Sequence, residues 1–125
     1  MPQILVTGGL GYIGSHTVIE LIEAGYEPII VDNLSESPLE VKTRIEKIVS
    51  RKVTFRQAEL CNRSEVDAVF QEFPNICGVI HFAAFLLVNE SVELPLKYYH
   101  NNLLSTINLL QSMEAHGIKN IVFSS

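Results

Sequence analysis

Short apolar, β-branched runs alternate along this chain with longer segments whose apolar residues recur at helical spacing. This alternation is typical of parallel strands joined by crossover helices, because parallel neighbours cannot be linked by a tight hairpin. The expected strands are residues 4–7, 28–31, 53–55, 78–82 and 120–123. The expected helices are residues 11–24, 39–49, 64–73 and 96–115, the third beginning on a capping-box pattern at 64–67. Right-handed crossovers then predict one parallel sheet in the order 3-2-1-4-5.

Composition limits the classes of partner. The chain has 125 residues, of which 47% are hydrophobic and 18% charged, so it can bury a core and is expected to form one domain spanning residues 1–125. Its net charge of −5 argues against nucleic acid and anionic membranes, which both select basic surfaces. We therefore expect no nucleic-acid partner and no membrane partner.

The cysteines and the amino terminus indicate a compartment. Cys61 and Cys77 stand far apart with no C-x-x-C pattern, which favours a reducing environment over a disulfide scaffold. The first strand begins without a basic leader, and no apolar run approaches the ~18 residues of a membrane-spanning helix. The histidines show no metal-ligand spacing. We expect a cytoplasmic protein without a metal site.

A glycine-rich turn lies between the first expected strand and the first expected helix. Gly8 permits a tight turn off the strand, and Gly11 lacks a side chain where a pyrophosphate must approach the backbone closely. Gly14 allows the helix to pack tightly onto the sheet. The unpaired N–H groups at the helix start carry partial positive charge, so this turn predicts a phosphate-binding site.

An acidic residue follows at the expected distance. Asp32 ends the second expected strand 18 residues after Gly14, close to the roughly 20 residues typical of a carboxylate that binds a ribose diol. Such a carboxylate repels a 2′-phosphate, which favours NAD over NADP. The alternative is that Asp32 only caps a turn before Asn33. Together these features predict an α/β fold, a Rossmann-type doubly wound parallel sheet that binds NAD.

Several segments resemble the UDP-glucose 4-epimerase family of extended short-chain dehydrogenases/reductases. They occur in the family's order along the whole chain, and they correspond to about the first third of such an enzyme. The matching segments are TGGxGYIGSHT at residues 7–17, DNL at 32–34, HFAA at 81–84, ESV at 90–92, PLxYYxNN at 95–102 and KNxVFSS at 119–125, where x marks a position outside the match.

The resemblance implies a set of NAD-binding residues. They are Gly8, Gly11, Tyr12, Ile13 and Gly14 at the pyrophosphate, Asp32 and Asn33 at the adenosine ribose, Glu59 and Leu60 beside the adenine, Phe82, Ala83 and Ala84 along the ribose and phosphates, and Asn101 near the nicotinamide end. Some positions depart from the family pattern: Glu59 stands for the usual aspartate, Leu86 for a frequent lysine, Asn89 for a common glycine, and Ser105 for the glycine after the asparagine pair.

The family's catalytic residues are missing. Its chemistry uses a Tyr-x-x-x-Lys pair, whose lysine lowers the pKa of the tyrosine, together with a serine. The residues four positions after the four tyrosines are His16, Ile30, Asn102 and Leu103. The resemblance places the serine just beyond Ser125. We therefore expect a chain that is truncated after its fifth strand and lacks catalytic residues. A UDP-sugar is expected to bind only to the full-length enzyme.

Alternative interpretations stay open. The chain could instead be the NAD-binding part of another sugar-nucleotide epimerase or dehydratase, or a ligand-free truncated structural module. His81, on an expected central strand, is interpreted as a core residue, or as one that supports site residues without touching a ligand, rather than as a base. An open sheet edge after residue 123 predicts association into a homodimer.

Overall fold

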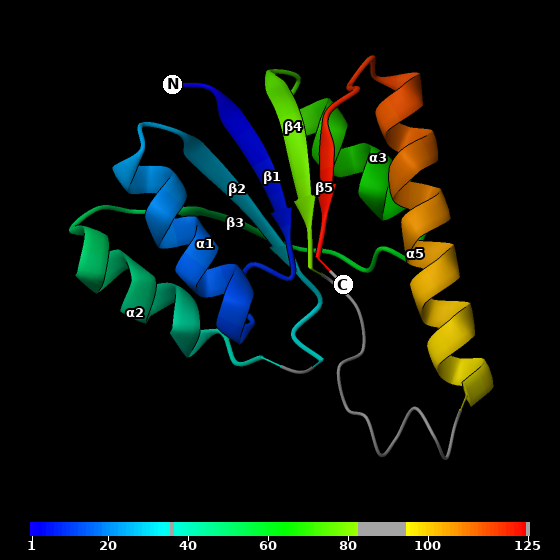
Figure 1. Cartoon of the computed structure of the whole chain (residues 1–125), viewed down its shortest axis with the longest axis horizontal. Coiled ribbons are helices and arrows are strands. Elements are labelled where there is room, and N and C mark those ends of the chain that lie inside the picture. Colours follow the sequence, from blue (N-terminus) through cyan, green and yellow to red (C-terminus); the bar gives the residue numbers. More distant parts are fainter. Residues whose placement is uncertain (36, 83–94, 125) are drawn as a thin grey trace.

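A computed structural model describes residues 1–35, 37–82 and 95–124. Its five strands form one sheet in the order β3-β2-β1-β4-β5, and each neighbouring pair runs parallel (Figure 1). The predicted strand order is therefore confirmed. The strands are β1 (Gln3–Thr7), β2 (Glu27–Asp32), β3 (Thr54–Gln57), β4 (Ile76–His81) and β5 (Ile121–Phe123).

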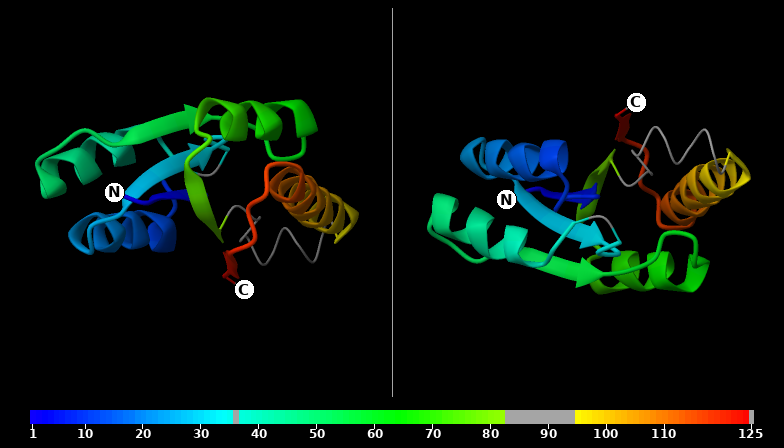
Figure 2. Two further views of the ribbon diagram at one scale, coloured as in Figure 1. Left: turned by 90° about the horizontal axis from the view of Figure 1, so that it is seen from above. Right: turned by 90° about the horizontal axis from the view of Figure 1, so that it is seen from below.

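Helices cover both faces of the sheet (Figure 2). In the described part of the chain they are α1 (Tyr12–Glu23), α2 (Glu40–Val49), α3 (Arg63–Glu72) and α5 (Pro95–Ala115). The first two pack with one apolar cluster, and α3 and α5 pack with another on the opposite face. This is the predicted Rossmann-type doubly wound α/β arrangement. No helix among the described residues is long and apolar enough to cross a membrane.

The central strands β1, β2 and β4 are apolar between their end residues because both of their faces are covered. Successive side chains point to opposite faces. Leu5 and Ile29 pack in the cluster with α3 and α5, whereas Val6 and Ile30 pack in the cluster with α1 and α2. All four are at most 1% exposed, and burying each contributes about 1.5–3 kcal/mol.

The start of α3 differs from the prediction. Asn62, not Ser64, is the N-cap: its backbone is extended, and its Oδ1 accepts a hydrogen bond from the Ser64 N–H at 3.1 Å. Ser64 already lies in the first helical turn, where its hydroxyl donates to the same oxygen at 2.7 Å. The capping-box prediction was wrong in position because Asn62, two residues earlier, supplies the acceptor that the helix start needs.

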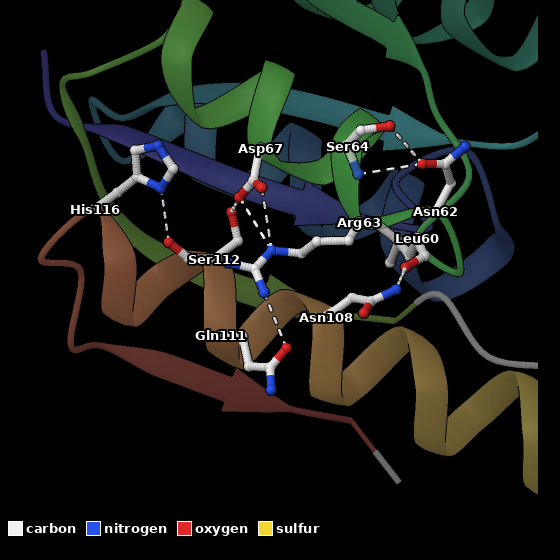
Figure 3. Close-up of polar contacts among 9 residues, drawn as sticks. All are labelled: Leu60, Asn62, Arg63, Ser64, Asp67, Asn108, Gln111, Ser112 and His116. Atoms are coloured by element: carbon white, nitrogen blue, oxygen red, sulfur yellow. Dashed lines mark hydrogen bonds and ion pairs between the residues drawn. The ribbon is translucent and has the colours of Figure 1, made fainter.

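Polar contacts join α3 to α5 (Figure 3). The Asp67 carboxylate accepts hydrogen bonds from Arg63 Nε at 3.2 Å and from Ser112 Oγ at 2.5 Å. The hydrogen bond from Ser112 is the main reason that the pKa of Asp67 lies below its usual value. Asn108 Nδ2 donates to the Leu60 carbonyl at 2.8 Å. The Ser112 contact holds α5 against α3, and the Asn108 contact holds α5 against the segment that follows β3.

Candidate nucleotide-binding site

The carboxyl ends of the parallel strands meet at one edge of the sheet. Thr7 ends β1, Asp32 ends β2 and His81 ends β4. The strand order reverses direction at β1, which lies between β2 and β4, so the crossover helices on either side of it cover opposite faces. In open α/β sheets, ligands bind outside the carboxyl ends of the strands at such a switch point.

The glycine-rich turn leaves β1 at this point. Gly8 adopts φ 68°, a left-handed conformation that favours glycine, and its N–H donates to the Val31 carbonyl at 2.7 Å. A Cβ on Gly14 would lie 2.2 Å from the Gly8 carbonyl oxygen. Gly14 therefore permits close packing of α1 against the turn itself. Gly9, which the sequence analysis did not single out, is the glycine against the sheet: its Cβ would lie 2.8 Å from Ile30 Cγ2.

The start of α1 exposes backbone donors. Its N-cap is Gly11, which has no side chain, and the first turn holds no acidic residue. No side chain in the described part of the chain caps this terminus. Tyr12 and Ile13 are 78% and 54% exposed, so neither side chain is held by packing over the turn. Ser37 Oγ would lie 3.9 Å from a Cβ on Gly11, which brings the segment after β2 beside the turn.

Asp32 lies between the turn and the segment after β2. Its Oδ2 accepts the Leu10 N–H at 3.3 Å, and its Oδ1 accepts the Leu34 N–H at 2.8 Å. Burial raises the pKa of Asp32, and these two bonds oppose that effect. The turn-capping alternative is thus part of the structure, yet each oxygen keeps acceptor capacity for a further donor. The turn also holds Leu34 at φ 64°, an uncommon conformation for leucine.

The residues expected near the adenine form a chain of contacts. Asn33 Nδ2 donates to Glu59 Oε2 at 2.8 Å, and Glu59 Oε1 accepts the Cys61 N–H at 3.1 Å. Glu59 therefore joins the segments that follow β2 and β3. Leu60 is 5% exposed and packs in the core with α3 and α5, so its side chain does not line this edge. Only its backbone could contact a ligand there.

Asn101, in α5, lies against the segment that follows β3. Cys61 Sγ donates to Asn101 Oδ1 at 3.3 Å, which places this side chain against the segment after β3. Burial, followed by the charge of Glu59, raises the pKa of the Cys61 thiol to about 11, so the thiol is neutral and a weak nucleophile at pH 7. Phe82 is half-buried and follows β4 directly, whereas Ala83 and Ala84 lie outside the described residues, as do Leu86 and Asn89.

His81 is a core residue, as interpreted from the sequence. It is 5% exposed, and burial lowers its pKa to about 4. The imidazole is therefore neutral at pH 7. Its Nδ1 lies 2.6 Å from Thr7 Oγ1, and its Nε2 lies 3.4 Å from Thr106 Oγ1.

The arrangement suits an elongated ligand that carries an anion and a diol. Backbone donors at the start of α1 match the anion, and the acceptor oxygens of Asp32 match paired hydroxyls. Among the described residues, no group of three or more His, Cys, Asp or Glu side chains is placed to hold a metal ion.

Comparisons with known proteins agree with this geometry. Residues 5–125 match the family model described as GDP-mannose 4,6 dehydratase. The chain is 54% identical over 123 residues to a UDP-glucose 4-epimerase of Dictyostelium discoideum, covering 98% of this chain and 36% of the relative.

Two solved structures are also similar. The UDP-glucose 4-epimerase from Stenotrophomonas maltophila, with bound NAD and formylated UDP-arabinopyranose, gives a TM-score of 0.95 at 42% identity, covering 100% of this chain and 37% of that one. The enzyme from Bifidobacterium longum, in complex with NAD+ and UDP, gives 0.94 at 44% identity, covering 98% and 36%. The chain thus spans little more than a third of the length of these relatives.

Proposed function

This chain belongs to the family whose model is described as GDP-mannose 4,6 dehydratase, and from that membership we propose that it is the NAD-binding portion of a UDP-glucose 4-epimerase-like enzyme. The observation that carries the proposal is the meeting of two features at one sheet edge. These are the start of α1, whose N-cap is a glycine, and the carboxylate of Asp32. The NAD in the two solved relatives supports the same ligand.

The residues at this edge fit NAD. The N–H groups of Tyr12, Ile13 and Gly14 would hold the pyrophosphate, because Gly11 leaves their approach open. Asp32 would accept hydrogen bonds from the adenosine ribose, with Asn33 and Glu59 shaping the neighbouring surface. The two backbone bonds to Asp32 hold its carboxylate in place before a ligand arrives, which lowers the entropic cost of binding.

Asp32 also gives the site its preference between dinucleotides. A 2′-phosphate on the adenosine ribose would meet a buried carboxylate whose two oxygens are already held by backbone donors. Bringing two anions together there is unfavourable, because the side chain cannot turn away without breaking both bonds. We assign the site to NAD rather than NADP.

The catalytic step belongs to a longer protein. We propose that the complete enzyme interconverts UDP-glucose and UDP-galactose through a 4-keto sugar. Bound NAD supplies the group that takes a hydride from the sugar and returns it. This 125-residue sequence contains no Tyr-x-x-x-Lys pair, so we expect it to bind NAD without catalysing epimerisation. The absence of UDP-galactose turnover by the purified chain, with NAD present, is the expected result.

Calorimetric titration with NAD tests the binding proposal. Asp32→Asn removes the charge but keeps the size of the side chain, and it should weaken NAD binding about 10–100-fold through loss of charge-assisted hydrogen bonds. The matched control is Glu114→Gln, which removes one negative charge from an exposed position near the carboxyl end of α5. That variant should bind NAD as the unaltered chain does.

The titration also separates the alternatives. An equal change in affinity in both variants would contradict the assigned site, because only Asp32 is placed to contact the ligand. No heat with NAD for a folded chain would favour the ligand-free structural module. In the Asp32→Asn variant, the affinity for NADP should increase relative to the affinity for NAD, because the charge that repels the 2′-phosphate is gone.

A second candidate is favoured by the family model itself, whose description names a dehydratase. The chain would then be the NAD-binding portion of another sugar-nucleotide epimerase or dehydratase. The polypeptide isolated from its native cells can be sized by mass spectrometry and assayed with UDP-galactose and GDP-mannose. UDP-glucose as the product supports the epimerase, and a 4-keto-6-deoxy sugar supports the dehydratase.

We also propose a homodimer in the cytoplasm. In the described sheet β5 is an edge strand, and its Val122 and Phe123 are 61% and 50% exposed, which favours association through this edge. Cys61 and Cys77 are free thiols, which suits a reducing compartment. A concentration series in the analytical ultracentrifuge and fractionation of native cells test the two statements. A monomer at every concentration would contradict the first, and recovery outside the cytosolic fraction would contradict the second.

A further inference from the structure

A buried imidazole links three elements at the carboxyl edge of the sheet. His81 ends β4, and its ring lies between Thr7 at the end of β1 and Thr106 in α5. The Nδ1 contact with Thr7 Oγ1, at 2.6 Å, is short, whereas the Nε2 contact with Thr106 Oγ1, at 3.4 Å, is long for a hydrogen bond. The strong contact is therefore the one that faces β1.

Thr7 connects this imidazole to the segments on either side of the switch point. It directly precedes Gly8, where the glycine-rich turn begins. The Phe82 N–H also reaches Thr7, at 3.0 Å from its carbonyl oxygen and 3.1 Å from its hydroxyl oxygen. One threonine thus binds both the last residue of β4 and the first residue after it. Backbone pairing with β2 and β4 holds Thr7 in the sheet, and the contact with the imidazole fixes its side chain.

The surroundings make the Thr7–His81 contact persistent. Thr7 is fully buried, and the neutral imidazole keeps one ring nitrogen as an acceptor and the other as a donor. The Thr7 hydroxyl oxygen also accepts the Phe82 N–H, and losing the imidazole contact would remove one of its hydrogen-bond partners inside the core, which is costly. Phe123 of β5 packs edge-on against the imidazole at 5.3 Å between ring centroids and closes it on another side.

We propose that His81 is a positioning residue of the nucleotide site, which through Nδ1 fixes Thr7 and thereby the place from which the glycine-rich turn leaves the sheet. It touches no ligand. The proposal rests on the proposed function in one respect, namely that the ligand bound at the turn is NAD. The positioning of the turn is a property of the chain itself and can be measured without a ligand.

The backbone bonds of the turn are its reporters. The Gly8 N–H donates to Val31, the Gly11 N–H to the Gly8 carbonyl, and the Leu10 N–H to Asp32. If Thr7 is released, these amides should exchange their hydrogens faster. The Val53 amide, which donates to Glu46 before β3, reports a region that does not contact His81.

Two substitutions separate the two ring nitrogens. His81→Asn carries an amide atom near the place of Nδ1 and can keep the Thr7 contact. His81→Gln places its amide one bond further, near Nε2, and can keep only the long contact with Thr106. Both leave the buried position polar and remove the ring. Ser112→Ala is the control for loss of a buried hydroxyl elsewhere, since Ser112 binds Asp67 away from the sheet edge.

Hydrogen exchange and NAD titration of the 125-residue chain test the proposal. His81→Gln should speed exchange of the Gly8, Leu10 and Gly11 amides about tenfold relative to the Val53 amide, and weaken NAD binding about tenfold. His81→Asn should stay within about threefold of the unaltered chain in both readouts. Urea unfolding of each variant measures the loss of global stability, which Ser112→Ala should show without any change in the turn.

The two histidine variants distinguish a positioning role from a merely structural one. Equal effects of the Asn and Gln variants on the turn, or no effect of either, would overturn the proposal, because a merely structural histidine predicts that result. If the unaltered chain binds no NAD, the proposed function fails, while the exchange of the turn amides still supports or overturns the role of His81.

Discussion

Gly14→Ala is the substitution that most sharply probes the geometry of the glycine-rich turn. The added methyl group would lie 2.2 Å from the Gly8 carbonyl oxygen and 3.0 Å from both the Gly8 carbonyl carbon and the Gly9 Cα. All three neighbours are backbone atoms, so no flexible side chain can move aside. Restoring a normal contact requires the turn and the start of α1 to separate by roughly 1 Å.

The cost follows from what holds the turn in place. Gly8 is tied to β2 by its 2.7 Å bond to Val31, so the separation must strain that bond or shift the helix. Overpacking in a well-packed region typically costs about 1–3 kcal/mol, and the backbone contacts favour the upper half of that range. For a chain of this size that loss lowers the melting temperature by about 8–12 °C.

Gly78→Ala is the matched control. Gly78 lies in β4, and an added Cβ would meet Ile4 Cδ1 at 3.5 Å and Asn120 at 3.6 Å, which are ordinary contacts. This variant should match the unaltered chain or be more stable by up to about 1 kcal/mol, since alanine suits a strand better than glycine. Urea unfolding and thermal melts measure both variants. Equal stabilities of the two variants would refute the packing described for the turn.

Three further predictions concern other parts of the chain. Burial lowers the pKa of His81 to about 4, whereas a histidine in the unfolded chain titrates near 6.5. The contribution of the neutral imidazole to the free energy of unfolding is therefore complete above about pH 6.5 and is lost as the pH falls toward 4. In urea unfolding, the stability advantage of the unaltered chain over His81→Asn should shrink by about 2–3 kcal/mol between pH 7 and pH 4.5. Because the pKa of Cys61 is raised to about 11, iodoacetamide at pH 8 should modify the exposed Cys77 first, as read by mass spectrometry of timed samples; faster labelling of Cys61 would contradict its burial. Asn62→Ala removes the cap of α3 and should cost about 1 kcal/mol in urea unfolding, whereas Ser64→Ala should cost less.

The fold could be predicted because its signals are local. The apolar runs around Leu5 and Ile29, together with the glycines after β1, indicate buried parallel strands and a crossover helix without any knowledge of distant contacts. Helix boundaries were less certain, since Asn62 and Ser64 are both good caps and only the backbone conformation decides between them.

From the sequence, the candidate site could be predicted only where its residues are close together along the chain. The turn and Asp32 follow from spacing along the chain, but the contact of His81 with Thr7 joins residues 74 positions apart, and that with Thr106 joins residues 25 apart. Periodicity carries no information on such pairs. The family resemblance places Leu60 beside the adenine, and packing against α3 and α5 turns its side chain inward, which leaves only its backbone for such a contact.

We propose that the start of α1 binds the pyrophosphate, and Asp32 the ribose, of one adenosine diphosphate group. A 1H–15N NMR titration of the chain with NAD measures this directly. We expect the largest shifts on the amides of Tyr12, Ile13 and Gly14, accompanied by a shift of the Leu34 amide, which is bonded to Asp32. Saturation by NAD with these four amides unmoved, or with the shifts gathered on another face of the sheet, would contradict it.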